Sequence, residues 1–330
     1  MKLPSDKFFV AIVGVIALAY LFPHWGSSKS NGPLDLLGSI GISLIFFFYG
    51  LKLSTQKMQN GLKNWRLHLL VQASTFILFP IIVLAFLPFV KEGANNMYWL
   101  SFLFLAAVPS TVSSSVVMVS MARGNVTAAI FNASISGLLG IVITPLLVGL
   151  FLTKTNTEFD LNTVYLKLLT EIIVPVLIGL TLQKYFGAFA VKNNRYLSFF
   201  DKSVILLIVF KSFAASFYNQ VFAAIKVSQL LMVAAATLLL FFSVYFFIGW
   251  ISKKLLLNRE DQITAQFCGT KKSLIHGTIF SKILFSASFP MGIILLPLML
   301  FHAFQLLLIS ILAARLLEEQ TKSKKYKIAS

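Results

Sequence analysis

The chain has 330 residues, of which 58% are hydrophobic and only 12% are charged, about half the charged share of a soluble domain. So few charges cannot cover the surface of a soluble fold, and the apolar residues form long continuous runs. This excludes a soluble enzyme, a disordered chain, a coiled coil and, because the runs do not alternate, a transmembrane β-barrel. The net charge of +17 does not indicate nucleic-acid binding, because basic residues of membrane proteins collect in cytoplasmic loops.

Ten apolar runs approach the roughly 20 residues that cross a bilayer as a helix. They lie near residues 8–23, 34–51, 67–89, 98–122, 126–152, 163–186, 197–219, 227–252, 262–285 and 289–317. The first run resembles a signal peptide, but no small-residue cleavage site follows it, so we expect a retained span. Most Lys and Arg residues fall on one side if both termini are cytoplasmic. This predicts an integral protein of the plasma (bacterial inner) membrane.

The two halves of the chain share one plan. Five runs precede the polar segment 153–162 and five follow it, so the second half enters the membrane upside down relative to the first. We therefore expect a first five-helix repeat over 1–156, a second, inverted repeat over 157–317 and a basic cytoplasmic tail over 318–330. Inverted repeats are typical of transporters, whose site lies at the repeat interface near the bilayer midplane.

The fourth run is interrupted by a proline and a cluster of hydroxyls. Pro109 removes a helix donor, and hydroxyls that could contact a solute follow it at Ser110, Thr111, Ser113, Ser114 and Ser115. Irregular backbone within a membrane is tolerated only where protein buries it or where it lines a cavity. The alternative is a simple proline kink whose backbone groups are satisfied by Ser and Thr.

The ninth run carries the stronger signal, the stretch Gly269, Thr270, Lys271, Lys272 and Ser273. Each lysine costs about 2.5–3.5 kcal/mol at the centre of a membrane helix, and ionisable residues there are usually functional. The alternative is a loop at 271–272, but apolar residues flank the pair on both sides. The acidic residues lie in loops or at span ends, so we expect an anionic ligand, a lysine that transfers a proton, or both.

Further polar residues lie inside the predicted spans. They are Gln72, Asn132, Ser134, Ser136, Lys211, His302 and Gln305. The amides of Gln72, Asn132 and Gln305 could cap broken backbone or present oxygen to an ion. The alternative for an isolated amide or histidine is a hydrogen bond between neighbouring helices.

The sequence resembles the bile acid:sodium symporter superfamily, in its SBF-like branch, which includes bacterial proteins and the vertebrate seventh member of solute carrier family 10. The stretches that carry the resemblance span nearly the whole chain. They are 32–34, 46–53, 67–72, 128–132, 140–147 (GIVITPLL), 267–274 (FCGTKKSL), His302 and Gln305. The runs 140–147 and 267–274 are the specific ones, and the others support them.

The resemblance implies an all-α membrane protein of ten helices in two inverted five-helix repeats. It implies a panel of spans one, two, six and seven, and a core in which the broken fourth and ninth spans cross. It further implies alternating-access transport of a small organic anion coupled to sodium. No other cofactor is expected, and the sequence does not define an oligomeric state.

This chain departs from the family at the sodium site. The family's ninth-span glutamate falls on Phe267, its glutamine on Lys271 and its asparagine on Lys272, while a fourth-span Ser-Asn pair falls on Ser115 and Val116. A family glutamine matches Gln72. A sodium ion would therefore be expected near Ser115, Asn132 and Gln72, but an ammonium group lies close to that position. We expect the lysines to replace or modify sodium coupling, with proton coupling as the other option.

The alternatives to a transporter are a regulatory protein, a membrane enzyme and a channel. A regulatory or sensory membrane protein could keep the same fold without solute flux, in line with a calcium-homeostasis role linked to eukaryotic members of the branch. A membrane enzyme is disfavoured, because acidic residues are nearly absent from the spans and no paired-carboxylate or His-Glu-x-x-His pattern occurs. A channel is disfavoured because neither a filter motif nor a ring of charges is visible.

Overall fold

The computed structural model describes residues 7–26, 32–52, 64–91, 93–111, 113–152, 166–220, 222–223, 226–285 and 289–329. The regular structure within these ranges is entirely helical, as expected for a chain that must satisfy its backbone groups inside hydrocarbon. In this part of the chain five helices are long and apolar enough to cross a membrane, and three shorter apolar helices accompany them. The segment 153–162 and the expected repeat boundary at 156/157 lie outside the described residues.

The helices of the first half follow the expected ranges. They are α1 (Lys7–Leu21), α2 (Gly32–Lys52), α4 (Trp65–Ala73), α5 (Phe79–Ala85), α6 (Met97–Ala107), α7 (Ser113–Met121) and α8 (Val126–Leu152). A π-helical turn, η4 (Ser74–Leu78), joins α4 to α5 without a gap. Short 3-10 turns lie at η1 (Pro23–Gly26), η5 (Leu87–Phe89) and η6 (Gly93–Asn95).

The helices of the second half also follow the apolar runs. They are α10 (Val174–Lys192), α11 (Asn194–Tyr218), α12 (Val227–Lys254), α13 (Arg259–Thr270), α14 (Leu274–Leu284) and α15 (Met291–Ala329). A second π-helical turn, η7 (Leu169–Ile173), leads into α10. Helix α15 continues without interruption into the expected basic tail, as far as Ala329.

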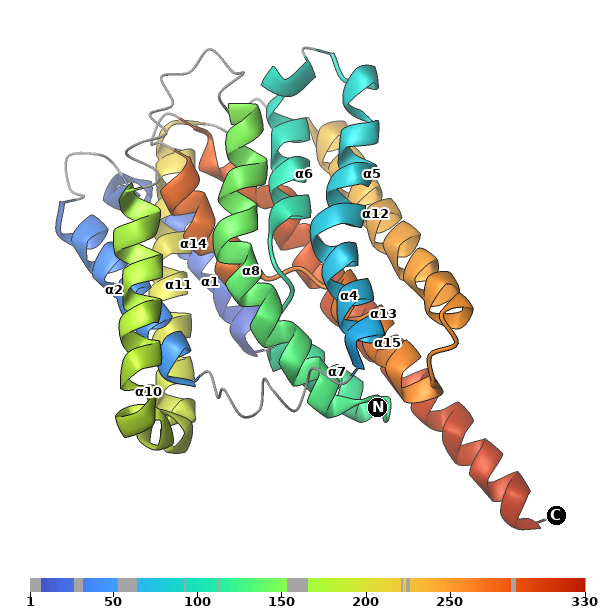
Figure 1. The fold of residues 1–330 in the computed structure, drawn as a ribbon. Coiled ribbons are helices and arrows are strands. Elements are labelled where there is room, and N and C mark those ends of the chain that lie inside the picture. Colours follow the sequence, from blue (N-terminus) through green and yellow to red (C-terminus); the bar gives the residue numbers. More distant parts are fainter. Residues whose placement is uncertain are drawn as a thin grey trace.

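The helices form two groups that lie side by side (Figure 1). The panel group contains α1, α2, α10 and α11, which contact one another. The crossing group contains α4 to α8 and α12 to α15. Helix α14 lies next to the panel group, because α11 packs against α14 and α15. Elements from both halves of the chain build each group.

Helices α2 and α10 approach closely through two glycines that face each other. A Cβ atom added to Gly50 would lie 3.1 Å from the Cα of Gly179, and the reverse substitution gives the same distance. Side chains at either position would therefore force the helices apart. Small residues that allow such backbone contact are common between membrane helices.

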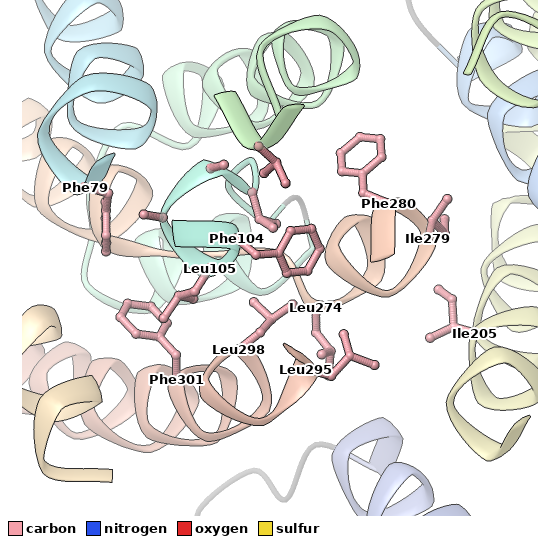
Figure 2. Packing of buried hydrophobic residues seen from close by; sticks show 14 of the residues in the cluster. Phe79, Phe104, Leu105, Ile205, Leu274, Ile279, Phe280, Leu295, Leu298 and Phe301 are labelled. Carbon is pink, nitrogen blue, oxygen red and sulfur yellow. The ribbon is translucent and has the colours of Figure 1, made fainter. Parts of the chain in front are cut away.

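Apolar side chains fill the interior around the two broken helices. Phe79 of α5, Leu105 of α6 and Phe301 of α15 converge on one side of the cluster (Figure 2). Ile279 of α14 faces Ile205 of α11 on the other side, so α14 lies between the panel group and the rest of the crossing group. This interior excludes water from the polar residues described below.

A buried carboxylate ties three helix starts together at one end of the crossing group. Asp261, 4% exposed, accepts hydrogen bonds from the side-chain amides of Asn64, before α4, at 2.6 Å and Asn125, before α8, at 2.9 Å. Its own place in the first turn of α13 is favourable for a negative charge. This arrangement fixes α4, α8 and α13 relative to one another.

Candidate functional site

The first break separates α6 from α7. Pro109 cannot donate a hydrogen bond, so α6 ends at Ala107 and its last carbonyl groups need other partners. Thr144 of α8 donates its hydroxyl to the carbonyl of Ala107 at 2.8 Å. The amide of Ser110 donates to the hydroxyl of Ser136, also in α8, at 2.9 Å. Helix α8 therefore supports the irregular backbone of this break.

The second break separates α13 from α14 and crosses the first. The amide of Ser273 donates to the carbonyl of Pro109 at 2.8 Å. In return, the hydroxyl of Ser110 donates to the carbonyl of Cys268 at 2.7 Å. Two interrupted helices from the two halves of the chain thus satisfy each other's backbone groups, which removes the cost of leaving them unpaired in hydrocarbon.

Lys272 is fully buried at this crossing, with 0% exposure. Its ammonium group donates to the carbonyl oxygens of Thr75, Ala106 and Val108 at 2.8, 2.6 and 2.9 Å. The Nζ atom also lies 4.2 Å from the centre of the Phe79 ring, a favourable cation–π position. An ammonium group has three hydrogens, so this network uses every donor of the Lys272 ammonium group.

The sequence explains why these three carbonyls are available. The π-helical turn η4 shifts the hydrogen bonds by one residue, so that the amide of Phe79 donates to the carbonyl of Ser74. The carbonyl of Thr75 would then need the amide of residue 80, which is Pro80 and has none. Ala106 and Val108 lie at the C-terminal end of α6. Carbonyls there lack helical partners, and this end of the helix dipole carries the negative partial charge.

Gln305 of α15 fixes the backbone of the second break. Its side-chain oxygen accepts the amide of Lys272 at 2.8 Å, and its side-chain nitrogen donates to the carbonyl of the same residue at 2.8 Å. That nitrogen also lies 2.8 Å from Nδ1 of His302. Gln305 therefore bonds to both backbone groups of Lys272 in the extended chain. This is the capping of broken backbone that the sequence offered as one option for this amide.

Lys271 is equally buried, at 0% exposure, but its environment is the opposite. Its Nζ atom makes no hydrogen bond to any part of the chain that the structure describes. Within the same ranges the one buried carboxylate is Asp261, which two asparagines already bind and which lies ten residues earlier, roughly 15 Å along a helix. A buried, unpaired ammonium group is a strong attractor for an anion.

The other expected site residues include a cluster of hydroxyls and a pair of amides. Thr111 bonds to Ser114 and Ser115 through their hydroxyls at 2.9 and 2.8 Å, and Gln72 donates to the side chain of Asn132 at 3.2 Å. The side-chain oxygen of Gln72 is buried and makes no hydrogen bond within the described residues. Thr111 lies in the break before α7, and the other groups belong to helices α4, α7 and α8, which pack beside α13.

Two further expected residues of α13 form hydrogen bonds within their own helix or with the turn η4. Thr270 donates its hydroxyl back to Gln266 of its own helix at 2.6 Å, and the carbonyl of Gly269 accepts from Ser74 at 3.0 Å. The side chain of Ser113 lies outside the described part of the chain. No group of three His, Cys, Asp or Glu side chains suited to a metal occurs among the described residues.

The sequence did not identify several residues that the structure brings to the crossing. Ser74 and Thr75 act through the π-helical turn, Phe79 through its ring, and His276 through a contact between its Nδ1 and the Ser273 hydroxyl at 2.9 Å. Tyr49 of the panel group packs against His276. For Ser74 and Thr75 the sequence contains one signal, the proline at position 80 that follows them.

The fold and the crossing define a class of membrane transport protein, and comparison with known proteins agrees. The model of the SBF-like CPA transporter family matches residues 6–318, and the chain belongs to this family. The protein is therefore an integral membrane protein of a transporter family.

Individual relatives match over nearly their whole length. An uncharacterized protein, PA2026, of Pseudomonas aeruginosa is 37% identical over 94% of this chain and 92% of its own. The putative symporter YfeH of Escherichia coli is 35% identical over the same shares. Sodium/bile acid cotransporter 7 of Xenopus tropicalis is 32% identical over 94% of this chain and 91% of its own. These matches bear out the resemblance that the sequence motifs indicate.

Proposed function

We propose that the protein is a secondary transporter that moves a small organic anion by alternating access. The observation that carries the proposal is the pair of fully buried lysines at the crossing of two broken helices. Lys271 is the unpaired one, and among the described residues no buried carboxylate lies beside it. Broken helices that meet near the midplane are where secondary transporters bind solutes and coupling ions. The names of the relatives, a putative symporter and sodium/bile acid cotransporters, support a solute of this class.

Lys271 supplies the positive charge that binds the anion. Its Nζ atom keeps all three hydrogens for a ligand, whereas those of Lys272 are used by carbonyl oxygens. An oxyanion that reaches Lys271 gains a charge-assisted hydrogen bond and relieves the cost of the unpaired charge. The hydroxyls of Thr111, Ser114 and Ser115, on α7 and the break before it, add neutral donors to the proposed site.

Lys272 takes the place of a coupling cation. Carbonyls of unwound segments and of half-helix C-terminal ends are the usual ligands of sodium in transporters. The three carbonyls that hold the Lys272 ammonium group are of this kind, and a permanently attached cation there leaves no position for sodium. We infer that this chain does not need sodium at this point of the crossing, and that its coupling differs from that of sodium-dependent members.

The membrane arrangement follows from the same proposal. Ten spans in two inverted repeats, with the panel and crossing groups as the two moving parts, fit the helix ranges and the clustering of Lys and Arg residues. The protein then resides in the plasma membrane, the inner membrane of a bacterium, with both termini in the cytoplasm.

The test is anion binding and flux with and without the Lys271 charge. Purified protein is assayed by thermal shift with acetate, benzoate and taurocholate, and reconstituted liposomes are assayed for uptake of the anion that stabilises it. Lys271→Gln should weaken binding about tenfold to a hundredfold, the effect of losing a charge-assisted hydrogen bond of about 1.5–3 kcal/mol. The matched control is Lys254→Gln, because Lys254 contacts the Trp250 ring far from the crossing.

The outcomes separate the alternatives. Equal affinity in wild type and Lys271→Gln would contradict the role of this lysine. Binding without uptake in liposomes would contradict transport and favour a regulatory protein on a transporter fold. Absence of stabilisation of the wild type by any of the three anions would contradict the proposed substrate class.

A further inference from the structure

His276 lies where the two helix groups meet. It is in the first turn of α14, directly after the second break. Its ring packs against Phe46 and Tyr49 of α2, with centroids 6.3 Å away in each case, and against Phe280 of its own helix at 6.1 Å. The ring therefore bridges the crossing group and the panel group. The proposed function does not use this residue.

The hydrogen bonds of His276 fix its orientation. The hydroxyl of Ser273 accepts the backbone amide of His276 at 3.3 Å as the cap of α14. The same hydroxyl lies 2.9 Å from Nδ1 of the ring and has one hydrogen left to donate. A neutral ring that accepts this hydrogen at Nδ1 carries its own hydrogen on Nε2.

The Nε2 atom has no partner within the described residues. His276 is 8% exposed, and its Nε2 atom, which makes no hydrogen bond within the described residues, is not fully buried. Gly137 of α8 faces it, and a Cβ atom there would lie 3.4 Å from Nε2 and 2.5 Å from the Tyr49 hydroxyl oxygen. Glycine is required at 137, because a side chain there would collide with the Tyr49 hydroxyl and crowd the Nε2 atom.

We propose that His276 is a specificity-determining residue of the anion site, and that its Nε2–H donates a hydrogen bond to an oxygen of the transported anion. This inference rests on the proposed function. Lys271 supplies charge without direction, since an ammonium group rotates freely. The imidazole supplies direction, because Ser273 and two aromatic rings hold its plane. An anion that contacts both meets the panel group and the crossing group at once.

Three substitutions separate hydrogen bonding from packing. His276→Gln can place an amide N–H near the position of Nε2, whereas His276→Asn can reach only the position of Nδ1. His276→Phe keeps the ring volume and its aromatic contacts but has no donor. Uptake of the anion that stabilises the wild type, among acetate, benzoate and taurocholate, is measured in liposomes together with the melting temperature of each variant.

We expect KM to rise about tenfold in His276→Asn and His276→Phe, in line with loss of one hydrogen bond, and to stay within about threefold of wild type in His276→Gln. The maximal rate should change less than KM.

If packing alone matters, His276→Phe will transport normally and His276→Gln will be the impaired variant, which overturns the inference. A KM that rises in Lys271→Gln and not in any His276 variant overturns it and leaves the proposed function intact. Failure of the wild type to bind any of the three anions overturns both.

Discussion

Two adjacent lysines in this chain have opposite environments. Lys272 has a partner for every hydrogen of its ammonium group, and Lys271 has none within the described residues. The sequence could predict that both lie inside the membrane, since apolar residues flank them. It could not distinguish them, because the partners of Lys272 are backbone carbonyls, which every residue possesses. The break in the helix decides the direction of each side chain.

The first prediction concerns Lys272 and sodium. Lys272→Gln replaces three charged donors with two neutral ones on a shorter side chain, and each carbonyl left without a donor costs about 1–3 kcal/mol. We expect a lower melting temperature, partly restored in sodium chloride relative to choline chloride at equal ionic strength, because vacated carbonyls can bind a small cation. The wild type should melt at the same temperature in both salts.

Lys254→Gln provides the control for the loss of a lysine as such. A wild type that sodium stabilises strongly would contradict the idea of an attached cation. So would a Lys272→Gln variant that is as stable as wild type in choline chloride.

At the scale of elements, the close contact of α2 and α10 holds the panel group together. The prediction is that Gly179→Val destabilises the protein by about 1–3 kcal/mol, the usual cost of overfilling a packed interface. The physical reason is the 3.1 Å approach of an added Cβ atom to the backbone of Gly50. Thermal unfolding in detergent, followed by size-exclusion chromatography, measures the effect.

The matched control is Gly14→Val in α1, where an added Cβ atom meets nothing within 4 Å. Both variants introduce the same side chain into an apolar helix. Equal melting temperatures for the two variants would show that the contact between α2 and α10 contributes nothing.

The sequence predicts the elements well where a residue type forces the backbone. Pro109 ends α6, and the polar stretch before Ser273 separates α13 from α14, as the two interruptions indicated. The π-helical turn at Ser74–Leu78 is different, because its only signal in the sequence is Pro80, which follows the turn. His276 likewise looks like an incidental polar residue in an apolar run until α2 is placed beside it.

At the scale of the whole molecule, polar contacts between described residues join the panel group to the crossing group. One such contact is the hydrogen bond from Lys282 of α14 to the hydroxyl of Ser39 of α2, at 3.1 Å. Another is the bond from the Tyr49 hydroxyl to the carbonyl of Ser134. The sequence could suggest two repeats but not these contacts, since they join residues about 240 and 85 positions apart.

The third prediction follows from movement between these groups. Cys268 is the single cysteine of the chain and is buried, so Cys268→Ala provides a background for labelling. Ser39→Cys in that background should react with a water-soluble maleimide at a rate that changes at least twofold when the transported anion is added. The change follows because α2 and α14 belong to different groups.

Tyr196→Cys is the control, because Tyr196 is 75% exposed at the start of α11 and does not lie between the groups. Its labelling should not depend on the anion. A constant labelling rate at Ser39→Cys, in protein that still binds the anion, would contradict relative movement of the two groups at this contact.

The long helix α15 converts a small tilt at the crossing into a larger displacement of its far end. Gln305 bonds to the backbone of the second break. From there α15 runs without interruption to Ala329, roughly 36 Å further along its axis. Its far end extends beyond the other helices (Figure 1). A tilt of about 5° at the crossing would swing that end by about 3 Å over this length. A dye pair on the end of α15 and the turn before α13 would therefore turn a small rearrangement around Lys272 into an optical signal.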